Sequence, residues 1–256
     1  MAEQQDHGRA VVVLDPPQSK RLIARAVAQL PEVQFALKNG RLIVGNGTTN
    51  AYVAEEILGR PLSKWRYAAG VVAGGRLDVT QGATRLEPVA LERGRPYPGG
   101  WVELLREFEA DDVFIKGGNA LDPEGNVGVL LASPVGGTVG QMAGILAARG
   151  SHLIAPIGLE KLIPDVVEAA RHCGTLATDW TDGLPSGMAV LENARVVTEL
   201  EAFEILAGVS AWQIASGGIC GSEGSVTIAL EGPRASVERA FQLAESLAGE
   251  PAIARE

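Results

Sequence analysis

Residues 112–157 read DVFIKGGNALDPEGNVGVLLASPVGGTVGQMAGILAARGSHLIAPI, and this stretch decides the fold class. It begins and ends with short apolar runs, 112–115 and 152–157, which are typical of buried strands. Between them, residues 138–149 carry apolar side chains at helical spacing. A strand, a helix and a second strand favour parallel pairing, because a parallel connection needs a crossover segment.

The same alternation extends outward from this unit. Ser19 and Thr138 are expected as helix N-caps, Thr138 in a capping box with Gln141. Residues 60–100 are rich in Gly, Pro and Arg and predict long loops around strands at 67–72 and 85–91. Further strands are predicted at 9–15, 41–44, 127–131, 176–178 and 188–191, and further helices at 19–30, 51–58, 101–108 and 164–172.

The pattern changes after about residue 195. A strand at 196–197, a helix over 199–206, two β-rich runs and a final helix over 236–247 give the order of a small ferredoxin-like unit. We therefore predict a loose tail over 1–8 and an α/β domain over 9–195. Its mainly parallel, Rossmann-like sheet is flanked by helices, and residues 196–256 form a small C-terminal α+β, ferredoxin-like lid.

Composition narrows the functional class. The chain has 256 residues, 46% of them hydrophobic, with 31 acidic against 22 basic side chains. A net charge of −9 disfavours nucleic-acid binding. No apolar run approaches the roughly 20 residues of a membrane span, and the polar start is unlike a targeting peptide. Two cysteines and three histidines show no metal-ligand spacing. We expect a cytoplasmic protein without metal or bound cofactor, and its many small and apolar side chains are compatible with a homodimer.

The first candidate binding segment follows the strand at 41–44. Glycines let the backbone turn sharply, and amides at a helix start attract anions. A phosphate, carboxylate or thioester oxygen would suit this turn, although it lacks the lysine of a P-loop and the spacing of a dinucleotide site. A well-capped turn without a ligand is the alternative. The segment consists of Gly45, Asn46, Gly47, Thr48 and Thr49.

The second candidate segment follows the strand at 112–115, where open α/β sheets place their sites. Lys116 could neutralise an anion or bear a carbonyl intermediate, and Asp122 or Glu124 could move protons. For Asp122 and Glu124 an ordinary solvated turn is the favoured alternative. The binding residues expected here are Lys116, Gly117, Gly118 and Asn119.

A third glycine-rich segment, Gly136, Gly137 and Thr138, leads into the next helix. Two anion-friendly loops on either side of a lysine at a strand end form a site-like constellation. One such loop alone would be weak evidence. The three segments together predict one binding site for an anionic small molecule.

These motifs carry a resemblance. GNGTTNA at 45–51 is similar to the sugar-phosphate loop of ribose phosphate isomerases, and IKGGNALDPEGNVGVLLASPVGGTVGQMAGILAARGSHLIAPIG at 115–158 resembles that family's next strand end, turn, helix and strand. HLIAPIGLEKLIPDVVEA at 152–169 resembles LUD-domain proteins of lactate utilisation. The resemblance covers roughly residues 40–170. It implies the NagB/RpiA/CoA transferase-like fold, a lid at the C-terminus, and sugar phosphates or CoA esters as substrates, with CoA as part of the substrate.

Departures from the family pattern bear on activity. The isomerases carry two aspartates where this chain has Lys116 and Asn119. The glutamate that serves as their catalytic base corresponds to about Ala143 of this chain. Proton transfer between adjacent carbons needs such a carboxylate, so we expect no ribose phosphate isomerase activity. Glu124 is the nearest candidate for the glutamate nucleophile of a CoA transferase.

Two function hypotheses follow. The first is an enzyme that isomerises or transfers an acyl or CoA group on an anionic substrate, with Lys116, Asp122 and Glu124 as catalytic candidates. The second is a catalytically inactive binding or regulatory protein that keeps the pocket. A third, structural subunit would pair through residues 60–100.

Overall fold

The computed structural model describes residues 6–256, and a six-stranded sheet lies at its centre. Four neighbouring strands are parallel, and the last two are antiparallel. The expected mixed α/β architecture with a mainly parallel sheet is therefore confirmed. In order across the sheet, the strands are β12 (Arg195–Val197), β10 (His152–Pro156), β7 (Val113–Ile115), β2 (Arg41–Val44), β5 (Val89–Glu92) and β6 (Arg95–Pro96).

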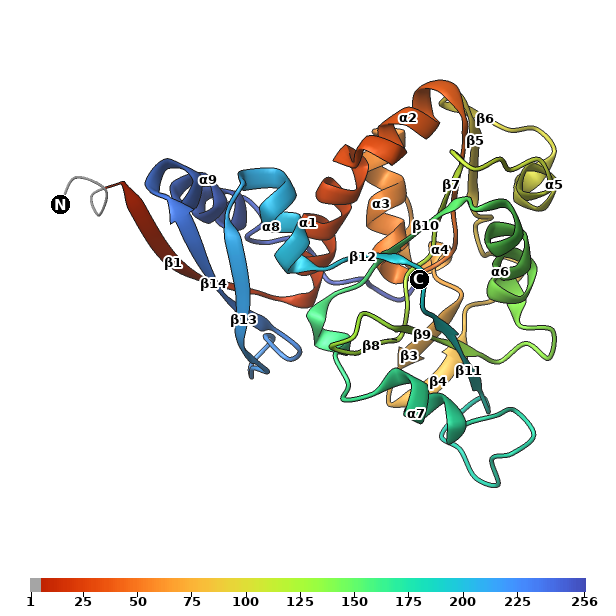
Figure 1. The fold of residues 1–256 in the computed structure, drawn as a ribbon. Helices are drawn as coiled ribbons and strands as arrows, with labels where there is room; N and C mark the ends of the chain where they lie inside the picture. Colours follow the sequence, from red (N-terminus) through yellow and green to blue (C-terminus); the bar gives the residue numbers. More distant parts are fainter. Residues whose placement is uncertain (1–5) are drawn as a thin grey trace.

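Helices cover both faces of this sheet. Figure 1 shows α1 and α3 on one side and α5 and α6 on the other. The middle strands are consequently buried on both faces, which is why β7 is a continuous apolar run. The helices of this part are α1 (Pro16–Gln29), α2 (Pro31–Asn39), α3 (Thr48–Leu58), α4 (Lys64–Tyr67), α5 (Gly100–Arg106), α6 (Gly137–Arg149) and α7 (Val166–Arg171), with a 3-10 turn, η2 (Leu159–Lys161).

Two small antiparallel sheets lie beside the carboxyl ends of the parallel strands (Figure 1). One is the hairpin of β3 (Gly70–Ala73) and β4 (Arg76–Val79). The other contains β8 (Ala120–Leu121), β9 (Val127–Leu131) and β11 (Gly187–Leu191). The strand predicted at 67–72 begins only at Gly70, because residues 64–67 form α4, and the strand predicted at 176–178 is a turn.

A three-stranded antiparallel sheet forms a separate small unit. Its order is β1 (His7–Leu14), β14 (Val226–Pro233) and β13 (Ser210–Ser216), and α8 (Glu199–Ala207) and α9 (Arg234–Glu245) pack on it. We assigned residues 1–8 to a loose tail and 9–15 to the α/β domain, whereas the structure pairs β1 with β14, from His7 opposite Pro233 to Leu14 opposite Val226. Residues 1–5 of the predicted tail lie outside the described residues. The apolar run of β1 resembles a parallel core strand, but its alternate side chains are exposed on the open face of the small sheet.

Two helix starts differ from those predicted. The N-cap of α1 is Asp15, and Ser19 is buried inside the helix, because Pro16 and Pro17 suit the first helical positions. The N-cap of α6 is Gly136, whose φ of 74° is left-handed and favours glycine. Thr138 therefore lies in the first turn of α6 and makes no capping box.

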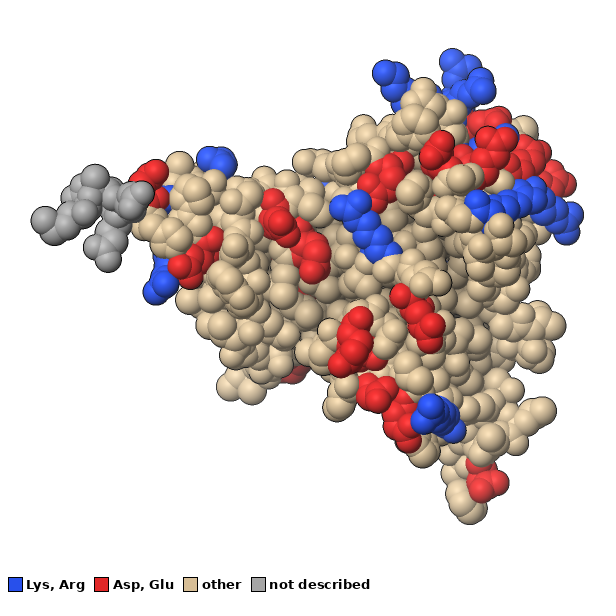
Figure 2. All heavy atoms as spheres, viewed as in Figure 1, with Lys and Arg blue, Asp and Glu red and all other residues tan. Residues whose placement is uncertain are grey.

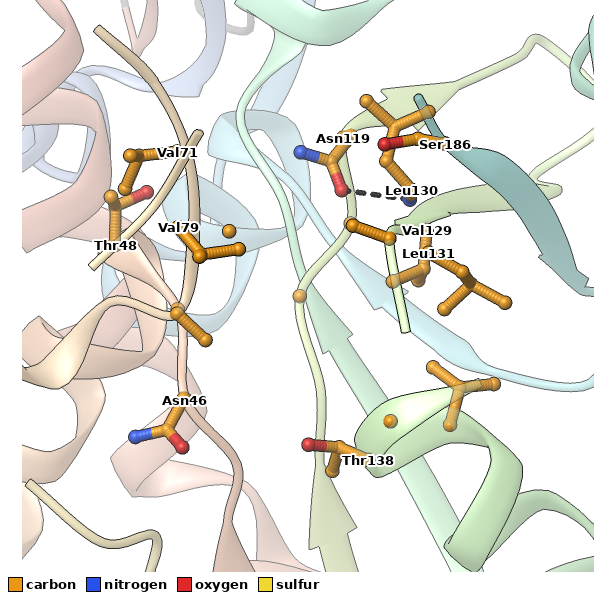
Figure 3. A pocket seen from close by; sticks show the side chains of 18 of the residues that line it. Asn46, Thr48, Val71, Val79, Asn119, Val129, Leu130, Leu131, Thr138 and Ser186 are labelled. Atoms are coloured by element: carbon orange, nitrogen blue, oxygen red, sulfur yellow. Dashed lines mark hydrogen bonds between the residues drawn. The ribbon is translucent and has the colours of Figure 1, made fainter. Parts of the chain in front are cut away.

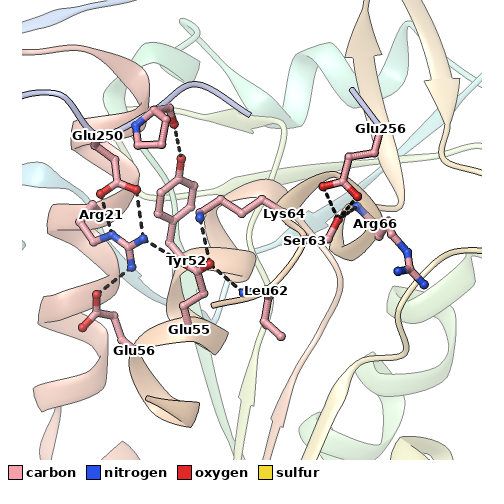
Figure 4. A network of polar contacts seen from close by, with 11 residues as sticks. Arg21, Tyr52, Glu55, Glu56, Leu62, Ser63, Lys64, Arg66, Glu250 and Glu256 are labelled. Atoms are coloured by element: carbon pink, nitrogen blue, oxygen red, sulfur yellow. Dashed lines mark hydrogen bonds and ion pairs between the residues drawn. The ribbon is translucent and has the colours of Figure 1, made fainter. Parts of the chain in front are cut away.

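The last residues of the chain return to the α/β unit. Figure 4 shows Glu250 beside Arg21 of α1, which also pairs with Glu55 and Glu56 of α3. The Tyr52 hydroxyl donates to the carbonyl oxygen of Pro251 over 3.4 Å. These contacts fasten the segment after α9 across α1 and α3.

Charged side chains are dispersed over the surface. On the face drawn in Figure 2, acidic and basic side chains are interspersed at the end that carries α2, β6 and α5, and much of the remaining face is uncharged. Within residues 6–256, no helix combines the length and apolar character needed to cross a membrane.

Candidate functional site

A cleft of about 270 Å³ lies at the carboxyl ends of β2 and β7. Figure 3 shows two facing walls, with Thr48, Val71 and Val79 on one side and Asn119, Leu130 and Ser186 on the other. All twelve predicted ligand-binding residues except Gly45 line this cleft. The three glycine-rich segments therefore meet in space, although about 90 residues separate the first from the last.

The segment 45–49 is shaped by buried hydrogen bonds. The Gly45 amide donates to the carbonyl oxygen of Ile115 over 2.9 Å, so β2 and β7 end together. The Asn46 side-chain amide donates to the carbonyl oxygens of Tyr67 and Leu86 over 3.0 and 2.9 Å. Asn46 therefore holds the loop around α4 against the cleft.

Asn50 connects the first two binding segments, and the sequence analysis did not single it out. It is completely buried in the first turn of α3. Its Nδ2 donates to the carbonyl oxygens of Gly45 and Ile115 over 2.7 and 3.2 Å, and its Oδ1 accepts from the Gly117 amide over 3.2 Å. An asparagine just inside a helix that follows a glycine turn is the signal that could have indicated it.

The helices α3 and α6 begin at the cleft. The cleft is lined by the first residues of both helices, Thr48 and Thr49 of α3 and Gly137 and Thr138 of α6. Amides in the first turn have no partner within their helix and attract anions. In addition, Thr49 is 2% exposed, and its hydroxyl has no hydrogen-bond partner in the part of the chain that the structure describes.

Two lysines reach the same turn of the cleft. Lys116 Nζ donates to the carbonyl oxygen of Gly117 over 3.0 Å, and Lys161 Nζ donates to that of Gly118 over 2.9 Å. Burial, and next the charge of Lys161, lowers the pKa of Lys116 to about 8. Burial also lowers the pKa of Lys161, and Lys20 adds to that effect while Glu160 and Glu199 oppose it.

Lys161 lines the cleft but is not among the binding residues predicted from the sequence. It lies in η2, which follows the carboxyl end of β10, and thus at the same edge of the sheet as Lys116. Its position after a predicted parallel strand is the available signal. Neither Lys116 nor Lys161 forms an ion pair with a carboxylate of residues 6–256.

The remaining charges of the cleft belong to its hairpin wall. Arg85 lines it and donates from Nε to the hydroxyl of Thr80 over 2.8 Å. Asp78 of β4 is the acidic lining residue of the described chain, and it is exposed. Three cationic side chains against one carboxylate make the cleft positive within a chain of net charge −9.

Gly118 allows the backbone to pass close to its neighbours. A Cβ at this position would overlap Val127 and lie 2.9 Å from the carbonyl oxygen of Gly128. The turn at Gly118 therefore lies close against β9. Its carbonyl oxygen accepts a hydrogen bond from Lys161 and so positions the Lys161 ammonium in the cleft. Asn119 extends the contact, since its Oδ1 accepts from the Leu130 amide over 3.0 Å.

Asp122 and Glu124 lie outside the cleft lining. Asp122 is 3% exposed and accepts from the amides of Asn126 and Val166 over 2.9 and 3.0 Å. Although burial alone raises its pKa, these hydrogen bonds bring the pKa below its usual value. Asp122 thus anchors the β8–β9 turn to α7, while Glu124 is exposed in that turn. Among the described residues, no group of three His, Cys, Asp or Glu side chains is arranged to hold a metal ion.

A buried carboxyl pair lies behind Lys161. Glu199, at the start of α8, is completely buried, and its Oε2 accepts from the Leu159 amide over 2.9 Å. Glu199 Oε1 and Glu160 Oε2 have no hydrogen-bond partner within the described residues. Burial, and next the charge of Glu160, raises the pKa of Glu199 to about 7. Glu199 is therefore protonated in mildly acidic solution.

The unsubstituted protein is expected to lose stability as the pH rises, because Glu199 loses its proton. The variant Glu199→Gln is expected not to show this loss. The folded pKa of about 7 exceeds the ordinary value of 4.5, so this contribution is complete below about pH 4.5 and is lost as the pH rises through about 7. A shift of this size corresponds to at most roughly 3 kcal/mol. Urea unfolding at pH 5 and pH 8 measures it, with the exposed Glu238→Gln as control. Equal pH dependence in all three proteins would contradict the prediction.

The chain gives no match to known protein-family models, to curated proteins or to solved structures.

Proposed function

We propose that the cleft binds a small anionic molecule, with sugar phosphates, CoA esters and carboxylates as the ligand classes. The observation that carries the proposal is the pair of lysines in one cleft, held by the carbonyls of Gly117 and Gly118 and without a carboxylate partner in the described chain. A cation that is withdrawn from water without an ion-pair partner is costly, and an anionic ligand would supply that partner.

Two further features support an anion. The starts of α3 and α6 lie at the cleft, so their positive dipole ends add to the lysine charges. The hydroxyl of Thr49, which has no hydrogen-bond partner within residues 6–256, is available as a donor at the start of α3. Apolar lining side chains such as Val71, Val79 and Leu130 suit the carbon skeleton of such a ligand.

We also propose that the α/β unit is of the NagB/RpiA/CoA transferase-like type, with the small unit as its lid. Parallel strands whose carboxyl ends carry glycine-rich loops, and helices on both faces of the sheet, support this assignment. Because Asp122 is held by structural hydrogen bonds and Glu124 is exposed outside the cleft, we leave both out of the proposed site.

Calorimetric titration with glycerol 3-phosphate, acetyl-CoA and citrate tests the binding proposal. We expect saturable binding of one of these probes. Hydrogen bonds to charged groups contribute about 1.5–3 kcal/mol, so Lys116→Ala and Lys161→Ala are each expected to weaken binding by roughly 10- to 100-fold. Raising the salt concentration is expected to weaken binding as well.

Lys38→Ala is the matched control, because Lys38 is exposed on α2 and far from the cleft lining. It is expected to bind like the unsubstituted protein, and circular dichroism establishes that all variants are folded. The proposal is wrong if no probe binds, or if the cleft variants and Lys38→Ala bind equally well.

A further inference from the structure

We propose that Lys116 reacts reversibly with a carbonyl group, so that the ligand of the cleft carries an aldehyde or ketone in addition to its anionic group. This inference rests on the proposed anion site and names its substrate class. It depends on where the two cleft lysines lie, on what surrounds them, and on the chemical difference between lysine and arginine.

The choice of lysine is the first argument. The chain contains five lysines and 17 arginines, and two of the five line the same cleft. Lys20 and Lys64 form ion pairs with Glu160 and Glu55, and Lys38 is exposed. Arginine binds anions at least as well, but it remains charged, whereas a buried lysine can lose its proton and become a nucleophile.

The arrangement of the two amines is the second argument. Consecutive carbonyls, of Gly117 and Gly118, hold Lys116 and Lys161 at one turn. A lysine amine is activated when it is desolvated or lies next to another cation. Both conditions hold for Lys116, and they lower its pKa to about 8, so a substantial fraction is neutral at mildly alkaline pH.

The other charged groups near Lys116 and Lys161 determine which of the two amines keeps its proton. Arg85 and Asp78 line the cleft on the side of the β3–β4 hairpin, and neither contributes to the lowered pKa of Lys116. Glu160 and Glu199 act on Lys161 and favour its charged form, while Lys20 opposes it. The carboxylates thus favour a proton on Lys161, and the charge of Lys161 in turn favours the neutral form of Lys116.

The reaction balances without an oxidant or a cofactor. The lone pair of neutral Lys116 Nζ attacks the carbonyl carbon, a C–N bond forms, and a proton passes from nitrogen to the former carbonyl oxygen. Lys161 then gives a proton to the hydroxyl of this carbinolamine, the C–O bond breaks, water leaves, and a protonated imine remains. Lys161 can donate a hydrogen bond to the oxygen while negative charge develops on it. Hydrolysis reverses every step.

Borohydride trapping tests the inference. The full chain is incubated with glyceraldehyde 3-phosphate, reduced with sodium borohydride and mapped by peptide mass spectrometry. We expect the reduced adduct at Lys116, at least about tenfold more abundant than at exposed Lys38, with a trapping rate that rises between pH 7 and pH 9. Lys116→Arg is expected to lose this adduct, and Lys38→Arg is expected to keep it.

Glycerol 3-phosphate, which has no carbonyl, separates this inference from the proposed function. It is expected to bind Lys116→Arg and to compete with trapping in the unsubstituted protein. Glycerol 3-phosphate that binds without any preferential adduct at Lys116, or with labelling at Lys161 instead, overturns the inference and leaves the anion site standing. Failure of both phosphates to bind overturns the inference and counts against the proposed phosphate site.

Discussion

Arg21→Met is expected to reduce the free energy of unfolding by about 3–5 kcal/mol, the usual cost of removing one partner from a buried ion pair. Arg21 is mostly buried, and its guanidinium lies 2.6 Å from Glu55, 2.8 Å from Glu56 and 3.0 Å from Glu250. Burial works against its charge, but hydrogen bonds to these carboxylates raise the pKa of Arg21 above its usual value. Without Arg21, three carboxylates converge, and Lys64 remains beside Glu55.

Chemical denaturation at neutral pH measures this loss. Arg25→Met is the matched control, because Arg25 lies on the same helix, donates to the Ser246 hydroxyl over 3.4 Å and forms no ion pair within residues 6–256. It is expected to change stability by less than about 0.5 kcal/mol. A loss below about 1 kcal/mol in Arg21→Met would show that the network contributes no more than a surface ion pair.

Asn50→Leu is expected to cost on the order of 4 kcal/mol and to abolish ligand binding. The substitution leaves the carbonyl oxygens of Gly45 and Ile115 and the amide of Gly117 without the partner that Asn50 provides. An unsatisfied buried group costs about 1–3 kcal/mol. The Gly45 carbonyl and the Gly117 amide become such groups, whereas the Ile115 carbonyl still accepts from the Gly45 amide.

Thermal unfolding and glycerol 3-phosphate titration measure the two effects, with the exposed Asn39→Leu as control. Asn50→Asp provides a second comparison, since it keeps an acceptor for the Gly117 amide but loses both donated hydrogen bonds. It is expected to fall between the two leucine variants in stability. A stable Asn50→Leu that binds normally would remove Asn50 from the framework of the site.

The convergence of the binding segments could be predicted because it follows from parallel pairing. The strands at 41–44 and 112–115 are short runs that glycine follows within two residues, and parallel strands present their carboxyl ends at one edge. Lys116 and the turn at 45–49 therefore had to meet if the two strands were neighbours. The start of the helix at 137–149 reached the same edge for the same reason.

The rest of the cleft depends on contacts that no local pattern encodes. Arg85 and the β3–β4 hairpin belong to a stretch with little apolar periodicity, and their position is fixed by tertiary hydrogen bonds such as that from the Leu77 amide to the carbonyl oxygen of Asp182. Lys161 depends on the approach of η2 to Gly118. The sequence suggested Asp122 as a proton-transfer group. Its structural role could not be predicted, because the hydrogen bonds that it accepts from Asn126 and from Val166 on α7 form only in the folded chain.

The pairing of β1 with β14 constrains how the protein can be made. Ribosomes synthesise a chain from its amino end, so residues 7–14 emerge well before residues 226–233 and must wait for them. The strands of the α/β unit, from β2 to β12, are all synthesised before residues 226–233, so this unit can fold in that interval. The small unit is then completed in a last step that closes a very long loop, which is slow because chain entropy opposes distant contacts. During translation, the apolar side chains of Val12 and Leu14 are uncovered, and this interval is the period in which the nascent chain is most exposed to aggregation.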